Sequence, residues 1–120
     1  MSAEIKRLPH TWGIKGRSSG SIYNGMAWVA TVAEDKSPSI EAQTHSVFAR
    51  LESMLEAVGS DKTRILSATI HLANLSHKPR FDELYAAWMG DEPQHWPQRT
   101  CMGAELVSGY LVEIQLVAAV

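Results

Sequence analysis

The clearest pattern of hydrophobic and polar positions lies near the C-terminal end of the chain. Residues 110–120 alternate between apolar and other side chains with the repeat of a β-strand. The opposite face of this strand carries Glu113 and Gln115. The apolar face is formed by Val112, Ile114, Leu116 and Ala118. The pattern therefore predicts a strand that turns its apolar face to the core.

A second strand is predicted just before it, over residues 99–105. If the two strands are neighbours in the sheet, we expect Arg99 and Cys101 to lie on the same side as Glu113. The arginine would then hold a substrate carboxylate, with the glutamate beside it to handle a proton. Taken singly, each of these residues is more often a solvated charge or a small buried side chain. The pattern alone leaves the functional interpretation open.

Further strands are predicted in the first third and in the middle of the chain. Asn24-Gly25 separates strand-like runs at 17–23 and 26–32, and this dipeptide favours a tight hairpin because both residues tolerate positive φ. Another strand is predicted over 64–72, and residues 1–9 contain a candidate edge strand. The N-terminal half thus begins with strands that pair locally.

Two helices are predicted from apolar residues at helical spacing. The first covers residues 40–58, with Ser39 as its N-cap and Gly59 at its end. The second covers residues 79–89, starts with a proline and ends at Gly90. Each helix has one apolar side that needs a sheet to pack on.

This order of elements predicts a single α+β domain over residues 1–120, a two-layer sandwich with both helices on one face of the sheet. The run 26–32 is apolar on both faces, because Trp28 alternates with Ala27 and Val29. Two layers leave one of these faces without cover. We therefore expect the chain to associate with further copies of itself.

Composition narrows the classes of function. Of the 120 residues, 45% are hydrophobic and 20% are charged, and no apolar run reaches the ~20 residues of a membrane span. The N-terminus lacks the apolar stretch of a signal peptide and a single cysteine cannot form an internal disulfide, so we expect a cytoplasmic protein. The net charge of −2 disfavours nucleic acid as a partner.

The sequence contains no recognisable metal or cofactor motif. Its five histidines show no HxH or HExxH spacing and no Cys/His pairing, so we assign no metal. There is no glycine-rich nucleotide motif, and we expect no cofactor. A Cys–His nucleophile pair built on Cys101 stays open, although no histidine is tied to it by local spacing.

Several short segments form a set with a characteristic order and spacing. Pro97-x-Arg99-x-Cys101 is followed by Leu111-Val112-Glu113-Ile114 and a closing run of small apolar residues. Upstream lie Ile40-Glu41-Ala42-Gln43-Thr44, a helix end at 55–60, and Ala68-Thr69-Ile70-His71-Leu72. From about Ser18 onwards, this set resembles the RidA/YjgF family of reactive-intermediate deaminases.

The resemblance implies a chorismate-mutase-like fold with a mixed sheet, assembled as a homotrimeric barrel with ligand clefts between subunits. It also implies hydrolysis of reactive 2-enamine or 2-imino acids, or of a related pathway-specific imine, to 2-keto acid and ammonia without a cofactor. In that reaction Arg99 would bind the substrate carboxylate, Glu113 would act on the attacking water and Cys101 would line the site.

Alignment with this family also indicates departures in the expected pocket. Ser18 stands where typical members carry a tyrosine, and Ser76 near a position that is often asparagine. Thr31 and Val32 replace a serine and the glycine after it. The resemblance thus assigns Ser18, Thr31 and Ser76 to substrate binding. Because these positions differ from those of typical members, we expect a substrate that differs from the generic amino-acid-derived imine.

Two other functions stay open: a non-catalytic trimer that binds carboxylated metabolites and regulates, and an endoribonuclease or translation inhibitor.

Overall fold

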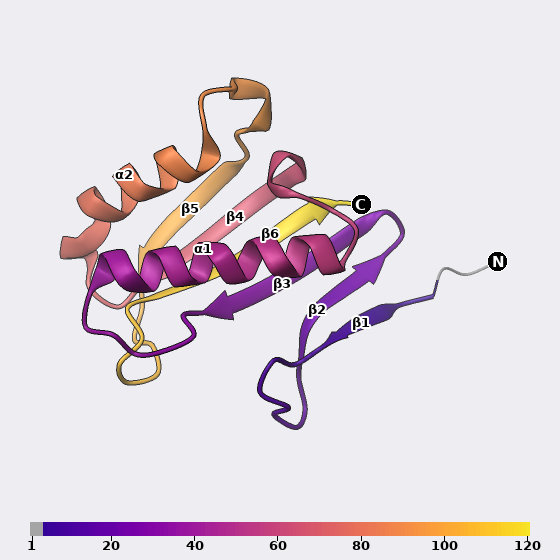
Figure 1. The fold of residues 1–120 in the computed structure, drawn as a ribbon, viewed down its shortest axis with the longest axis horizontal. Helices are drawn as coiled ribbons and strands as arrows, with labels where there is room; N and C mark the ends of the chain where they lie inside the picture. Colours follow the sequence, from indigo (N-terminus) through magenta and orange to yellow (C-terminus); the bar gives the residue numbers. More distant parts are fainter. Residues whose placement is uncertain (1–3) are drawn as a thin grey trace.

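A six-stranded mixed sheet forms the body of the protein in the computed structural model, which describes residues 4–120. Its strands follow the order β1-β2-β3-β6-β4-β5 (Figure 1). All neighbours are antiparallel except β4 and β5, which are parallel. The strands are β1 (Lys6–Pro9), β2 (Ser18–Tyr23), β3 (Met26–Val32), β4 (Ile65–Leu72), β5 (Gln98–Gly103) and β6 (Val112–Ala119). The predicted α+β class and mixed sheet are confirmed.

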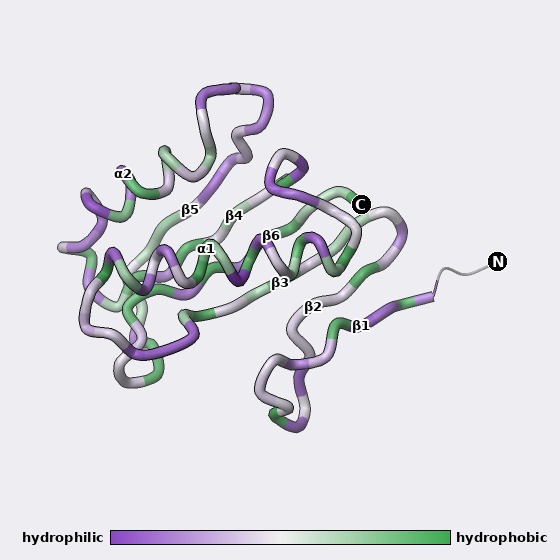
Figure 2. The backbone as a smooth tube through the Cα atoms, viewed as in Figure 1, coloured by the Kyte–Doolittle hydropathy of each residue, from purple (hydrophilic) through white to green (hydrophobic). Residues whose placement is uncertain are grey.

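Both helices cover the same face of this sheet (Figure 1). α1 (Ile40–Ala57) packs on β3 and β6, and α2 (Lys78–Met89) packs beside α1. Beneath them Val112, Ile114 and Leu116 of β6 are fully buried, as their alternation predicts. Figure 2 shows apolar residues along β6 and polar ones in the loop after α2. Within residues 4–120, neither helix has the length and apolar character needed to cross a membrane.

Local signals in the sequence set the ends of these elements. Asn24 and Gly25 have φ values of 52° and 80°, which a tight turn between β2 and β3 requires. Ser39 caps α1, because its Oγ accepts a hydrogen bond from the N–H of Ala42 at 3.1 Å. The candidate strand within residues 1–9 is β1 at the sheet edge, and residues 1–3 lie outside the described part of the chain.

The face of the sheet opposite the helices carries no second layer in the part of the chain that the structure describes. Met26 of β3 and Met102 of β5 are 37% and 45% exposed on it. Trp28 faces the same way, opposite Val117 of β6, and is half-buried. We call this surface the open face. Its apolar side chains are typical of a surface that another protein chain covers.

The predicted neighbour relation between the last two strands is wrong. β4 lies between β5 and β6, because the chain crosses over through α2 and adds β5 at the edge of the sheet. Through β4, Arg99 is aligned with Leu116 on the helix-covered face. Glu113 is aligned with His71 and Met102 on the open face. Arg99 and Glu113 therefore lie on opposite faces of the sheet and share no surface within one chain.

Candidate functional site

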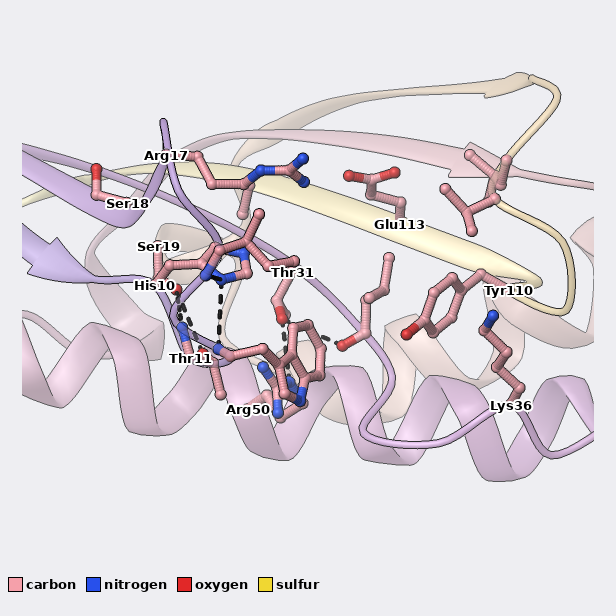
Figure 3. A pocket seen from close by; sticks show the side chains of 16 residues that line it. His10, Thr11, Arg17, Ser18, Ser19, Thr31, Lys36, Arg50, Tyr110 and Glu113 are labelled. Carbon is pink, nitrogen blue, oxygen red and sulfur yellow. Dashed lines mark hydrogen bonds between the residues drawn. The ribbon is translucent and has the colours of Figure 1, made fainter.

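A cavity of about 470 Å³ opens where β2 and β3 separate (Figure 3). β2 pairs with β3 from Gly20 onwards, so the two strands are apart at the level of Ser18 and Thr31. Three of the predicted site residues line this cavity, namely Ser18, Thr31 and Glu113. The loops before β2 and before β6 supply most of the remaining wall. The structure thus brings half of the predicted site together.

Thr31 positions an arginine at the wall of this cavity. Its Oγ1 accepts a hydrogen bond from Nε of Arg50 at 3.0 Å and donates one to the carbonyl oxygen of Val32 at 3.1 Å. The guanidinium carbon of Arg50 also lies 4.6 Å from the centre of the Trp12 ring, within cation–π range. These contacts orient the guanidinium through one nitrogen and one face, at the wall of the cavity.

Positive charge exceeds negative charge around the cavity. Arg17, Lys36 and Arg50 line it together with a single carboxylate among the described residues, that of Glu113. Figure 3 shows the side chains of Arg17 and Glu113 directed toward each other across the space. A cavity with this balance favours an anionic ligand. Sequence reasoning missed the three cations, because each is isolated in the chain and belongs to no motif.

Arg99 and Cys101 belong to a second group of residues, at the β5 edge on the helix-covered face. The guanidinium carbon of Arg99 lies 4.6 Å from the centre of the Tyr85 ring and 5.7 Å from that of Phe81, both on α2. Burial raises the pKa of the Tyr85 hydroxyl, and the nearby Arg99 offsets part of that rise. The two rings therefore present neutral faces that hold the guanidinium in place.

Asp82 of α2 links two cations of this second group. Its Oδ1 pairs with Nη2 of Arg99, and its Oδ2 accepts a hydrogen bond from Nζ of Lys78 at 2.8 Å. Burial opposes the charged form, but the hydrogen bonds from Arg99 and Lys78 outweigh it and hold the pKa of Asp82 below its ordinary value. Nη1 of Arg99 is buried and has no hydrogen-bond partner among residues 4–120. Sequence reasoning missed Asp82, whose one signal is its i,i+4 spacing from Lys78.

Cys101 is half-buried beside these charges. Burial raises the pKa of its thiol, and Arg99 and Lys78 offset part of that rise. The group is therefore a neutral thiol at neutral pH, which suits a wall residue better than a nucleophile.

Ser76 lies in neither group. It belongs to a short 3₁₀ turn, Leu75–His77, where its N–H donates to Oδ1 of Asn74 at 2.9 Å and its side chain is exposed. Residues 4–120 hold no group of three or more His, Cys, Asp or Glu side chains that could bind a metal ion. The predicted site residues thus divide into a cavity group, with Ser18, Thr31 and Glu113, and a β5-edge group, with Arg99 and Cys101.

Comparison with known proteins places this arrangement in a family. The family model described as Endoribonuclease L-PSP matches residues 20–120. The chain belongs to this family, the RidA/YjgF family. The resemblance predicted from the sequence is confirmed.

Relatives of this RidA/YjgF chain cover most of its length. A RutC family protein of Haemophilus ducreyi is 33% identical over 105 residues, which are 86% of this chain and 88% of the relative. The RutC family protein YoaB of Escherichia coli is 34% identical over 100 residues, which are 82% of this chain and 86% of the relative. These names state a family and leave the substrate to be determined.

Solved structures with the same fold also match nearly the whole length of this chain. A member of the YjgF protein family from Neisseria meningitidis superposes with a TM-score of 0.86 at 26% identity, covering 97% of this chain and 94% of that one. An uncharacterized protein from Pseudomonas aeruginosa gives a TM-score of 0.86 at 28% identity, with 97% and 98% covered. The RidA/YjgF fold therefore extends over nearly the whole chain.

Proposed function

We propose that this protein hydrolyses reactive 2-enamines and 2-imino acids, or a related pathway-specific imine, to the 2-keto product and ammonia. The reaction would take place in clefts between the subunits of a homotrimer. One observation carries the proposal: the substrate anchor Arg99 and the acid–base candidate Glu113 lie on opposite faces of one sheet. A single chain therefore offers two half-sites, and two copies are needed to make one site. Membership of the RidA/YjgF family supports the choice of reaction.

Association of the chains is supported by the open face. Met26, Trp28 and Met102 form apolar surface there, beside the cavity that holds Glu113. Covering apolar surface contributes about 25 cal/mol per Å² removed from water. A neighbouring copy that packs its β5 edge near this face would bring its Arg99 toward Glu113. The proposed trimer therefore both buries the open face and completes the site.

The proposed reaction adds water across the C=N bond. The guanidinium of Arg99, whose buried Nη1 has no acceptor among residues 4–120, binds the anionic end of the substrate and so places the imine carbon. Glu113 of the neighbouring subunit takes a proton from water as its oxygen bonds to that carbon. That proton passes to the nitrogen, which gives a carbinolamine with one hydroxyl and one amino group. Glu113 then takes the hydroxyl proton and passes it to the nitrogen, and the C–N bond breaks, so that ammonia leaves as the C=O bond forms. Cys101 contributes a neutral wall.

The test is a coupled assay with freshly generated imine. An amino-acid oxidase produces the 2-imino acid in the presence of semicarbazide, which traps whatever imine is not hydrolysed. An active protein lowers the rate of semicarbazone formation and raises the rate of 2-keto acid release, across a panel of amino acids. Loss of the effect in Glu113→Gln, with ligand affinity retained, identifies catalysis. Full-length protein with no effect on any imine of the panel would contradict the proposal.

Two other functions are separated by the same variants. A non-catalytic protein would bind metabolites in the same clefts without hydrolysing any imine, and Glu113→Gln would change this binding little. An endoribonuclease, the activity in the description of the matching family model, would instead bind RNA in a salt-dependent manner. We place the protein in the cytoplasm, beside the pyridoxal-phosphate enzymes that release such imines.

A further inference from the structure

We propose that the substrate carries a second anionic group, a carboxylate or a phosphate, on its side chain, and that Arg50 and Lys36 select this group in the cavity beside Glu113. The inference rests on the proposed function, in which Arg99 of a neighbouring subunit binds the first carboxylate of the imine. Its own basis is the charge of the cavity and the way in which its cations are held.

The cavity contains more positive charge than the proposed reaction uses. Its wall includes Arg17, Lys36 and Arg50, although the chain as a whole has a net charge of −2. Glu113 is the one carboxylate on this wall in the described part of the chain, and Figure 3 shows Arg17 directed toward it. None of the three cations forms an ion pair with a carboxylate of residues 4–120. The charges of Arg50 and Lys36 are therefore left for a ligand.

Neutral contacts hold Arg50 in place. Its Nε donates a hydrogen bond to Oγ1 of Thr31, and the ring of Trp12 lies 4.6 Å from its guanidinium carbon. The loop that carries Trp12 is tied to β2, because the N–H of Thr11 donates to Oγ of the buried Ser19 at 3.0 Å. These contacts position the guanidinium without neutralising its charge.

Lys36 is held in the same way at another part of the cavity wall. Its Nζ lies 5.0 Å from the centre of the Tyr110 ring, and Figure 3 shows the two side chains together. Its methylene chain packs on Gly109, where an added Cβ would come within 2.7 Å of Cδ of the lysine. A side chain at position 109 would therefore displace the lysine from this place. The ammonium group again has a position but no counter-charge.

A buried glutamine fixes the two loops that carry Lys36 and its contacts. Gln43 of α1 is 1% exposed, and its Nε2 donates to the carbonyl oxygens of Ser37 at 2.6 Å and Gly109 at 2.8 Å. Its Oε1 accepts a hydrogen bond from the N–H of Leu111 at 2.9 Å. Both loops are thus tied to the helix that also supplies Arg50. Because the wall is ordered without a ligand, a ligand loses less free energy in ordering it.

The side chain of the substrate is the part that meets these cations. With the first carboxylate at Arg99 of the neighbouring subunit and the imine carbon beside Glu113, the side chain of a 2-imino acid extends into the cavity. An apolar side chain would displace water from the guanidinium and the ammonium without replacing its hydrogen bonds. A carboxylate or a phosphate accepts charge-assisted hydrogen bonds from both groups. The substrate class is therefore a 2-imino acid with an acidic side chain.

The experiment compares three product-like probes on the assembled protein. 2-Oxoglutarate carries a distal carboxylate, 5-methyl-2-oxohexanoate carries a neutral isopropyl group of the same shape, and 2-oxo-4-phosphonobutanoate carries a phosphonate. Their dissociation constants are measured by NMR titration for the wild type, Arg50→Gln and Lys36→Gln. Lys15→Gln is the matched control, since Lys15 is an exposed cation on the loop that carries Arg17 but does not line the cavity. Thermal unfolding and light scattering check the fold and assembly of each variant.

We expect wild-type protein to bind 2-oxoglutarate at least about tenfold more tightly than the isopropyl probe. Arg50→Gln and Lys36→Gln should each weaken 2-oxoglutarate about threefold to tenfold and change the isopropyl probe less than about twofold. Lys15→Gln should change neither. Tighter binding of the phosphonate than of 2-oxoglutarate would identify the second anion as a phosphate, and the reverse order would identify a carboxylate.

Two results would overturn the inference. One is a wild-type protein that binds the isopropyl probe as tightly as 2-oxoglutarate, since the cavity would then take apolar side chains. The other is an equal loss of affinity for both probes in Arg50→Gln and Lys36→Gln, which would give these cations a structural role only. Lys36 is exposed, so Lys36→Gln decides the question if Arg50→Gln does not fold.

The imine assay separates this inference from the proposed function. If no imine is hydrolysed, that of glutamate included, the deaminase proposal fails, whereas the affinities for the three probes still decide the role of the cavity. If imines are hydrolysed but wild-type protein shows no preference for a dianionic probe, the second-anion site fails and the deaminase proposal stands.

Discussion

Replacing Arg99 with alanine tests the residue on which substrate binding depends in the proposed reaction. One guanidinium nitrogen is paired with Asp82, and the buried Nη1 has no partner among residues 4–120, so the proposed reaction assigns one charge-assisted hydrogen bond to the substrate. Such a bond contributes about 2 kcal/mol, which corresponds to roughly thirtyfold in kcat/KM. We expect Arg99→Ala to lose about that factor in the coupled imine assay. Arg99→Lys should lie between alanine and wild type, because an ammonium keeps the charge without the planar fork.

The same substitution perturbs stability much less than activity. It removes the stacking of Arg99 on Tyr85 and Phe81, worth about 0.5–1 kcal/mol at a partly exposed site. Asp82 keeps its hydrogen bond from Lys78, so no buried carboxylate is left alone. Arg99→Ala should therefore fold and assemble, as thermal unfolding and light scattering can show.

The matched control is Arg80→Ala, which removes an exposed arginine from the same helix layer. Arg80 pairs with Glu41 and with Glu83, both exposed, and contacts neither half-site. It should leave kcat/KM unchanged. If Arg99→Ala stays folded and assembled and hydrolyses imines at the wild-type rate, Arg99 is not the substrate anchor, and the reasoning from its unpartnered nitrogen is wrong.

Four further outcomes are expected. Cys101→Ser should keep most activity, because the thiol is neutral and serves as a wall, and a covalent adduct on Cys101 seen by mass spectrometry would contradict this. Arg50→Gln should weaken ligand binding severalfold in NMR titration, through the cavity side of the cleft, with little change in unfolding temperature. Asp82 has a lowered pKa in the folded state, so its stabilisation is present above its ordinary value of 3.8 and is lost as pH falls through the lower folded value. The free energy of unfolding of Asp82→Asn should therefore differ from that of wild type at pH 6, and the difference should shrink as the pH falls below 3.8. Light scattering should give a trimer, and a stable 13.2 kDa species at micromolar concentration would contradict the shared cleft.

The elements of this fold could be predicted because their signals are local. Asn24-Gly25 needs positive φ at both residues, and the structure has it. Ser39 caps the helix that begins at Ile40, and Gly59 follows its end with φ of 85°. Each of these signals depends on bonds within a few residues, which the sequence states directly.

The placement of the site residues could not be predicted, because it depends on which strands are neighbours. The alternation of side chains tells which residues share a face within one strand. It does not tell that β4 lies between β5, which carries Arg99, and β6, which carries Glu113. The strand predicted over 99–105 ends at Gly103, so Glu105 lies outside the sheet. The cations Arg17 and Arg50 reach the cavity from a loop and a helix, and their isolated positions gave no pattern to follow.

The position of β6 has a consequence for how the chain folds during its synthesis. β6 follows every other strand in sequence, yet it lies in the middle of the sheet and pairs with β3 on one side and β4 on the other. The ribosome delivers about 5–20 residues per second, from the N-terminus onward. Until Val112–Ala119 emerges, β3 and β4 each have one edge of unpaired backbone N–H and C=O groups, and the earlier strands cannot close into one sheet. The nascent protein is therefore at its most vulnerable to aggregation just before synthesis of this strand, and it gains its core in one late step.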